Sequence, residues 1–185
     1  MTNNSANITE GQQTRAYAGY YGLWVGLCWI ASFSLSVVGL QSPLASNLGL
    51  LLGVLSLPLG VKLVRSFGLN VAPLTLGRAW RLSWLMYGAA ALLCTAAQYI
   101  YFAYLDGGLL VRSYTDLLEQ PEMQDVMTQI LGPDSQTIAQ EALNAFAATP
   151  PAQLALQFLL WNLLLATFLA FPTALFSFTR KKAES

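Results

Sequence analysis

The 185-residue sequence contains no histidine. Histidine is the commonest general base and metal ligand that titrates near neutral pH, so its absence excludes Ser/His/Asp and Cys/His catalytic arrangements. The sequence also has no CxxC, HExxH or glycine-rich phosphate-binding motif. These absences argue against an enzyme, and neither a cofactor nor a metal site is expected.

Charged residues are scarce as well. They make up 10% of the chain, whereas hydrophobic residues make up 55%; a soluble domain has about 25% charged residues. Nine basic and nine acidic residues cancel, and without a basic face nucleic-acid binding has no support. Cys28 and Cys94 lie in apolar runs and are interpreted as buried small hydrophobes rather than a disulfide or a nucleophile. The composition predicts an integral membrane protein with the lipid bilayer as a partner.

Four apolar stretches predict the architecture. They lie at 17–40, 44–64, 82–105 and 154–178, and each is close to the ~20 residues that cross a bilayer. We therefore expect an all-α integral membrane four-helix bundle. The first stretch is longer than the ~7–15 residues of a signal-peptide core and is interpreted as a signal anchor. The second is short and contains Pro58, so a re-entrant hairpin is the alternative there.

The distribution of basic residues predicts the orientation. All except Arg112 fall on one side of the predicted spans: Arg15, Lys62, Arg65, Arg78, Arg81, Arg180, Lys181 and Lys182. Because lysine and arginine are retained on the cytoplasmic side, both termini are predicted to be cytoplasmic and residues 106–153 to lie outside. Residues 1–16 are expected to form a disordered cytoplasmic tail, followed by a single four-span domain over 17–182.

The outer segment, residues 106–153, is predicted to contain two short helices. The first covers 121–131, and the second begins at Asp134 or Ser135 and runs to about Ala147. Apolar residues of the first short helix recur at helical spacing. They form one stripe, which consists of Met123, Val126, Met127, Ile130 and Leu131.

The stripe has two interpretations. Helices this short are marginal by themselves, so the stripe can pack on the tops of the spans or lie at the headgroup layer. Alternatively it binds a membrane protein partner, since methionine adapts to irregular surfaces. We expect most of the stripe to pack within the chain, with one end free for a partner. Residues 109–119 are expected either to continue the third span or to fold back on it.

Small residues predict close helix packing in the first two spans. Gly22-x-x-x-Gly26 and Gly49-x-x-x-Gly53 each allow another backbone to approach closely, where the hydrophobic effect cannot drive association. We expect these motifs to pack the first hairpin internally rather than to form a dimer.

Prolines and amides mark other positions in the spans. Pro58 and Pro172 lie toward the predicted cytoplasmic ends of their spans and are expected to kink them, which would open a crevice on that side. Gln98 and Asn162 fall at similar depths and are predicted to hydrogen-bond to each other or to face the bundle interior. No acidic or basic residue lies deep in a span, which argues against ion-coupled transport.

Two sequence segments support a resemblance. Residues 74–80, Leu-Thr-Leu-Gly-Arg-Ala-Trp, lead into the third span, and residues 101–106, Tyr-Phe-Ala-Tyr-Leu-Asp, end it. With the amphipathic excursion and the last span with its basic tail, the chain resembles a four-span bacterial membrane family, domain of unknown function 4199, over about residues 16–182. It departs from that family at Asp106-Gly107, where members often have Asp-Pro. The resemblance implies the fold and a place in the bacterial inner membrane, but no activity and no functional residue.

The sequence supports two classes of function. The first is a non-enzymatic accessory or scaffold subunit of an inner-membrane complex, and the resemblance motivates a link to envelope glycan or lipid metabolism. The second is a homo-oligomeric passive channel or a lipid- or solute-handling protein. An enzyme acting through loop carboxylates is least favoured, because their spacing is that of a solvated helix face; these carboxylates are Asp116, Glu119, Glu122 and Asp125.

The predicted orientation can be tested by labelling a single cysteine. In a cysteine-free background, Asp125→Cys should react with a membrane-impermeant thiol reagent in intact cells, because residues 106–153 are predicted to lie outside. If the cysteine reacts only after the inner face has been exposed, the predicted orientation is inverted.

Overall fold

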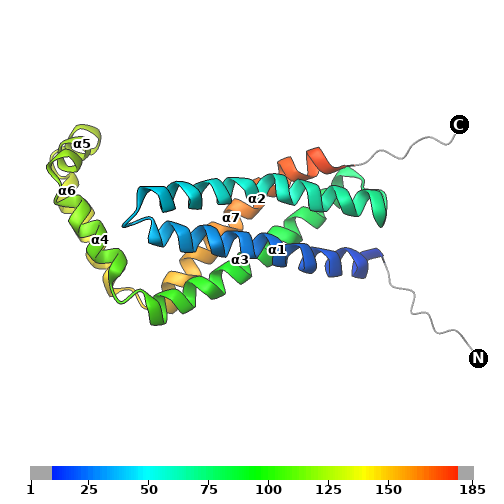
Figure 1. The fold of residues 1–185 in the computed structure, drawn as a ribbon, viewed down its shortest axis with the longest axis horizontal. Helices are drawn as coiled ribbons and strands as arrows, with labels where there is room; N and C mark the ends of the chain where they lie inside the picture. The colour runs from blue at the N-terminus through cyan, green and yellow to red at the C-terminus, as the bar shows by residue number, and fades with distance from the viewer. Residues whose placement is uncertain (1–9, 179–185) are drawn as a thin grey trace, which may run out of the picture.

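Seven helices make up residues 10–178, the part of the chain that the computed structural model describes (Figure 1). They are α1 (Glu10–Val38), α2 (Pro43–Asn70), α3 (Leu76–Ile100), α4 (Leu109–Leu118), α5 (Pro121–Leu131), α6 (Ser135–Ala148) and α7 (Pro151–Ser177), and a π-helical turn, η1 (Tyr101–Leu105), prolongs α3. Four of the helices are long and apolar enough to cross a membrane. The prediction of an all-α membrane protein with a helical excursion between the third and fourth spans is confirmed.

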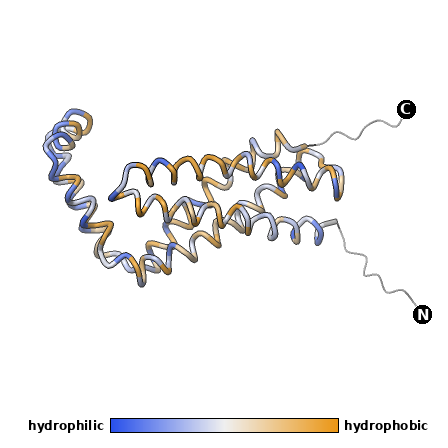
Figure 2. The backbone as a smooth tube through the Cα atoms, in the orientation of Figure 1, coloured by the Kyte–Doolittle hydropathy of each residue, from blue (hydrophilic) through white to orange (hydrophobic). Residues whose placement is uncertain are grey.

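The two described ends of the chain lie at the same end of the four long helices, and α4, α5 and α6 lie at the other end (Figure 1). We call these ends the terminal side and the arm side, and α4, α5 and α6 together the arm. Figure 2 shows apolar residues along the four long helices and many polar residues along the arm. Four crossings thus return the chain to the side from which it starts.

Proline, glycine and threonine set several helix boundaries. Pro43 and Pro151 occupy the first turns of α2 and α7, where a missing N–H costs nothing. The Thr75 side chain caps α3 by accepting a hydrogen bond from the backbone N–H of Arg78 at 3.4 Å. Gly132, with φ 91°, ends α5. Since α2 runs unbroken for 28 residues, the alternative of a re-entrant hairpin is wrong.

The first helix begins earlier than the sequence predicts. α1 starts at Glu10, so the prediction of a disordered tail to residue 16 is wrong from Glu10 onward; residues 1–9 lie outside the described part, as do Arg180, Lys181 and Lys182 of the predicted basic tail. The side chain of Thr14 is only 1% exposed and that of Ala18 only 2%. Burial against neighbouring helices stabilises these turns, which their polar composition alone does not mark as helical.

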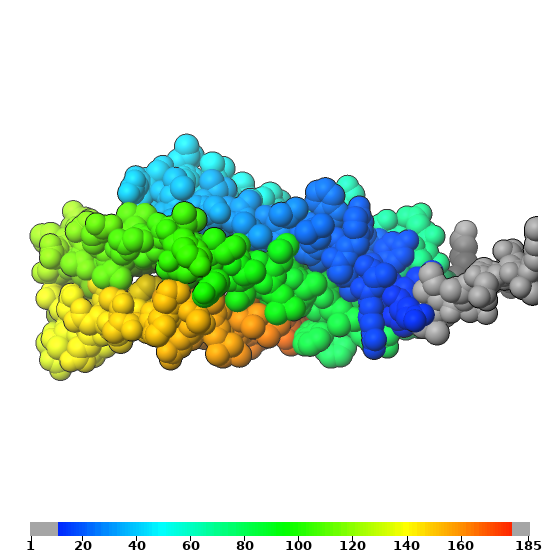
Figure 3. Space-filling view, turned by 90° about the horizontal axis from the view of Figure 1, so that it is seen from below, coloured from blue at the N-terminus to red at the C-terminus, as the bar shows by residue number. Residues whose placement is uncertain are grey.

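The four long helices form a row rather than a closed square. α1 packs extensively on α2 and on α3, and α3 packs extensively on α7, whereas α2 has fewer contacts with α7 and few with α3. Figure 3 shows α1, α3 and α7 as adjacent rows in this order. The buried core lies where the row closes on the terminal side, and its largest fully buried side chains include Tyr87, Phe67, Leu82 and Met86.

Polar contacts join α7 to both α3 and α2 on the terminal side. The Tyr87 hydroxyl of α3 is hydrogen-bonded to the Thr173 hydroxyl of α7 at 2.9 Å, and the Ser177 hydroxyl donates to the Val61 carbonyl of α2 at 3.2 Å. Gly60 makes room for the Tyr87 ring, since a Cβ at Gly60 would meet the phenol oxygen. These contacts close the row at one end only.

The glycine motifs pack two different helix pairs. A Cβ added to Gly22 would lie 2.7 Å from the Met86 carbonyl oxygen of α3, and Gly26 is similarly close to Leu93. The prediction that the first motif packs within the first hairpin is therefore wrong, because its partner is α3. Gly49 does pack in the hairpin, where an added Cβ would lie 3.0 Å from the Ser32 carbonyl oxygen. Gly53 lies on the same side, 3.1 Å from the Ser32 hydroxyl by the same measure.

Close packing at Gly22 predicts a stability difference between two matched variants. Gly22→Ala should destabilise the protein by about 1–3 kcal/mol, because the new methyl group meets α3 backbone. Gly19→Ala is the control: nothing lies within 4 Å of a Cβ there, so that variant should be neutral or slightly more stable. Thermal unfolding in detergent measures both. Equal stabilities would show that α1 does not approach α3 this closely.

Candidate functional site

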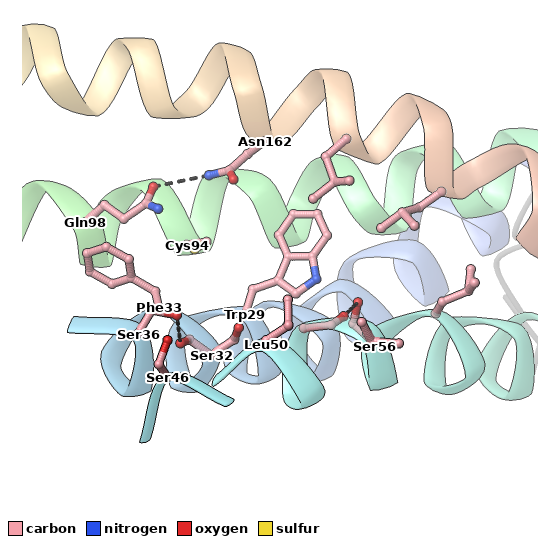
Figure 4. Close-up of a pocket in the computed structure, with 15 residues that line it drawn as sticks. Trp29, Ser32, Phe33, Ser36, Ser46, Leu50, Ser56, Cys94, Gln98 and Asn162 are labelled. Atoms are coloured by element: carbon pink, nitrogen blue, oxygen red, sulfur yellow. Dashed lines mark hydrogen bonds between the residues drawn. The ribbon is translucent and has the colours of Figure 1, made fainter. Parts of the chain in front are cut away.

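A cleft of about 720 Å³ lies between the α1–α2 hairpin and the α3–α7 pair, on the arm side of the core (Figure 4). All four long helices contribute to its lining. The residues are Trp29, Ser32, Phe33, Ser36, Ser46, Leu50, Gly53, Val54, Ser56, Leu57, Cys94, Gln98, Asn162, Leu165 and Leu169. Its volume falls within the ~300–1,000 Å³ of typical ligand pockets, and like them it is mainly apolar with a few polar groups.

The predicted amide pair forms part of one wall. The Asn162 Nδ2 donates to Gln98 Oε1 at 3.2 Å and to the Thr95 hydroxyl at 3.4 Å, so the predicted interhelical hydrogen bond is confirmed. Gln98 is 5% exposed, and Asn162 is half-buried. Within residues 10–178, no protein hydrogen-bond partner is found for Gln98 Nε2 or for Asn162 Oδ1. The pair therefore leaves an amide donor and an amide acceptor at the cleft.

Four serine hydroxyls line the opposite wall, and those of Ser32, Ser36 and Ser56 already donate to backbone carbonyls. The Ser32 hydroxyl donates across the hairpin to the Gly49 carbonyl at 2.7 Å. The Ser36 hydroxyl donates to the Ser32 carbonyl at 2.9 Å, and the Ser56 hydroxyl donates to the Gly53 carbonyl at 2.6 Å. Hydrogen-bonded serines of this kind satisfy backbone and hold the hairpin together. Among the described residues that line the cleft, the Gln98–Asn162 amides, the Trp29 indole N–H and the exposed Ser46 hydroxyl have hydrogen-bonding capacity to spare.

Trp29 forms the terminal-side floor of the cleft. Its indole is 7% exposed and stacks on the Tyr87 ring, with the ring centroids 6.0 Å apart and the planes at 17°. Figure 4 shows the Trp29 indole standing between α1 and α7. Because Tyr87 is itself fixed by Thr173, the floor belongs to the rigid core.

The mouth of the cleft faces sideways, between α2 and α7. Leu50 and Val54 on α2 and Leu165 on α7 line the cleft and are each at least 47% exposed. They belong to helices that can cross a membrane, so their exposed surface is the surface that lipid covers. The cleft therefore opens toward hydrocarbon along the side of the bundle.

The two prolines lie inside unbroken helices. α2 continues through Pro58, and α7 continues through Pro172; the kinks stay predictions. A crevice was expected on the terminal side, and a hollow of about 430 Å³ lies there beside Pro58, Lys62 and Arg65. The larger cleft lies toward the arm and was not predicted from the prolines.

The two cysteines are free. The Cys28 thiol contacts the Leu52 carbonyl of α2 with a sulfur–oxygen distance of 3.4 Å, and Cys94 is buried at the cleft. The two side chains thus contribute to different helix contacts.

The arm lies across the arm-side end of the bundle (Figure 1), and a hollow of about 620 Å³ lies between α4 and residues 39–41 of the α1–α2 loop. Its three helices pack mainly on one another, and aromatic contacts join it to the spans: Phe146 of α6 lies 6.1 Å from Phe102 of η1, centroid to centroid, and Phe102 stacks on Phe158 of α7 at 5.4 Å. The arm thus lies over one end of the spans, as expected, but contacts them at few points. α5 and α6 do have the predicted positions, and α4 is a separate helix after a turn.

The apolar stripe is mostly uncovered. Met123 and Met127 are half-buried, whereas Val126 is 49%, Ile130 74% and Leu131 65% exposed. The expectation that most of the stripe packs within the chain is therefore wrong. The reason is geometric, because α5 lies at the far end of the arm, where only α4 and α6 are within reach.

An unpredicted hydrogen-bond network fixes the base of the arm. The Asp106 carboxylate accepts hydrogen bonds from the Tyr101 hydroxyl at 2.8 Å and from the backbone N–H groups of Gly108 and Leu110 at 3.0 and 3.3 Å. Gly107 and Gly108 have φ angles of 51° and 79°, which glycine adopts without strain. The signal in the sequence was an acidic residue followed by two glycines, which is typical of a tight turn before a helix.

One family model matches residues 20–178 of the sequence. Its description is "Protein of unknown function (DUF4199)". The chain belongs to this family. In the DUF4199 chain the match includes α1 from Tyr20 onward, the other three spans, the arm and the cleft. The comparisons with curated proteins and with solved structures returned no match.

The amide pair predicts energetic coupling between α3 and α7 of the DUF4199 chain. Asn162→Leu should destabilise it, because Gln98 then loses its partner in a buried position. The double variant, which also carries Gln98→Met, should be less destabilised than the sum of the two single variants, with a coupling energy of about 0.6–2 kcal/mol. Unfolding of the wild type, both single variants and the double variant in detergent measures this cycle. Additive effects would show that the two amides are energetically independent.

Proposed function

We propose that the protein is a non-enzymatic accessory subunit of a membrane protein complex, and that its arm binds the partner. The observation that carries this proposal is the exposed stripe on α5. Val126, Ile130 and Leu131 are exposed on an arm that lies beyond the ends of the four long helices. Exposed apolar patches of this kind mark interaction sites.

The charge of the arm favours a protein partner over lipid headgroups. Exposed carboxylates surround the stripe, and the arm has one basic residue, Arg112; the carboxylates are Asp116, Glu119, Glu122, Asp125, Asp134 and Glu141. Anionic headgroups repel such a surface, whereas a partner with a basic rim around an apolar centre complements it. We infer that the partner presents such a surface.

The location belongs to the same proposal. The resemblance and the family membership support the bacterial inner membrane, and the positive-inside rule supports cytoplasmic termini. The arm then lies outside the cytoplasm, where a partner with an extracytoplasmic domain meets it.

The cleft favours a second function, that of handling lipid. Its mouth opens between α2 and α7, and its terminal end is closed by Trp29, Tyr87 and Thr173. A lateral opening with a closed end suits a molecule that enters from the bilayer. The same geometry gives less support to a passive channel or to passage of a soluble solute, which need an aqueous path along the bundle.

The subunit proposal predicts the effect of two charge-matched pairs of substitutions. Val126→Asp with Ile130→Asp places two carboxylates on the stripe and should remove the partner from the purified complex. Thr128→Asp with Gln129→Asp places the same charge on the opposite, exposed face of α5 and should leave the partner bound. Partner stoichiometry is measured by mass spectrometry after purification in mild detergent.

Thermal stability separates binding from folding in this experiment. Because Val126 and Ile130 are exposed, both pairs of substitutions should change the melting temperature little. Equal partner stoichiometry for the two variants, or no stoichiometric partner for the wild type, contradicts the proposed subunit function.

A further inference from the structure

Gln98 presents an unpartnered polar group to the cleft although its side chain is 95% removed from solvent by the protein itself. The Asn162 amide nitrogen uses its hydrogens on Gln98 Oε1 and on Thr95, which leaves the Gln98 amide nitrogen with two hydrogens to donate. Reversing both amides still leaves one NH₂ group and one carbonyl group open. In hydrocarbon an unsatisfied donor costs several kcal/mol, so an occupant with a hydrogen-bond acceptor would be stabilised at this position.

The depth of Gln98 specifies where that acceptor lies. The third crossing helix, Leu76–Leu105, has 30 residues and is about 45 Å long at ~1.5 Å per residue. It therefore matches a bilayer with its headgroup layers, about 40–45 Å, around a hydrocarbon core of ~30 Å. Gln98 lies about 10 Å below the arm-side end of this helix by the same rise. That depth is close to the boundary of the hydrocarbon, where a lipid's acyl chains join its headgroup.

The rest of the cleft fits an apolar chain. Leu50, Val54 and Leu165 line its open side, and the hydroxyls of Ser32, Ser36 and Ser56 opposite already donate to backbone carbonyls. A chain entering between α2 and α7 gains apolar contacts and loses no hydrogen bond. The bilayer supplies such chains directly at the mouth of the cleft.

We propose that this cleft binds one ester-linked lipid of the arm-side leaflet, whose ester carbonyl accepts a hydrogen bond from the Gln98 amide. The acyl chain lies between α2 and α7 and ends near Trp29. Gln98 and Asn162 thus select for the linkage, and Leu50, Val54 and Leu165 hold the chain. This proposal rests on the lipid-handling function and is independent of the partner that the arm binds.

Two lipids that differ only in their linkage test the selectivity. The full-length protein is incubated in detergent with a diester phosphatidylglycerol and with a diether analogue that has the same headgroup and chain length, and native mass spectrometry measures the bound fraction of each. The wild type should prefer the ester by about three- to tenfold, the effect of one neutral hydrogen bond. Gln98→Met with Asn162→Leu removes both amides, so it should bind the two lipids equally.

A matched pair of tryptophan variants tests the position of the chain. Leu165→Trp fills the cleft and should reduce binding of both lipids at least tenfold. Leu164→Trp adds the same bulk at a position that is also exposed but does not line the cleft, and it should bind like the wild type. Melting temperatures confirm that each variant is folded.

The possible outcomes separate the proposals. Equal ester and ether binding by the wild type, with binding still lost in Leu165→Trp, would overturn the role of the amides while the lipid-handling function stands. No lipid bound by the wild type, with water or a second copy of the chain in the cleft, would overturn both. Neither result affects the test of the arm.

Discussion

The approach of α1 to α3 at Gly22 and Gly26 constrains the positions of the other helices. With no side chain at these positions, the two backbones come close enough that a single methyl group would meet the Met86 carbonyl. A neighbouring face of α1 carries Ser32, whose hydroxyl donates to the Gly49 carbonyl of α2, and Ser36, which lies in close contact with Gly49. α1 therefore packs on both α2 and α3, and α2 and α3 have few contacts with each other.

That separation explains why an opening exists and where it lies. α2 reaches the α3–α7 pair only on the terminal side, where Gly60 admits the Tyr87 ring and Ser177 bonds to Val61. Toward the arm the helices part, and the Gln98–Asn162 bond holds α7 to α3 rather than to α2. The cleft and the arm consequently share one side of the membrane. A lipid in the cleft would lie beneath any protein bound to the arm.

The sequence predicted features that depend on composition along one helix. The spans followed from apolar length, the helices at 121–131 and 135–148 followed from periodicity and capping residues, and the Gln98–Asn162 pair followed from matched depth. It did not predict features that depend on which helices are neighbours. A glycine motif has the same spacing whichever helix it faces, so Gly22 and Gly26 could not identify α3 as their partner.

Other failures have the same physical origin. Residues 10–16 are polar, and only burial against neighbouring helices, as at Thr14, makes them part of α1. The α5 stripe has the periodicity of a packed helix, yet the position of the arm leaves most of it uncovered. The cleft combines residues from four helices, and no linear pattern contains that combination.

The π-helical turn Tyr101–Leu105 adds one residue to the end of α3. In this turn the Asp106 N–H donates to the Tyr101 carbonyl at 2.9 Å, five residues back instead of four. Each additional residue rotates everything that follows by about 100° around the helix axis, and here it brings the Asp106 carboxylate to the Tyr101 hydroxyl. The direction in which the arm leaves the bundle, measured around the axis of α3, thus depends on one residue in this turn. A relative without that residue would keep the same spans and the same stripe, but the stripe would face a different side of the bundle. A partner protein would then have to bind from that side.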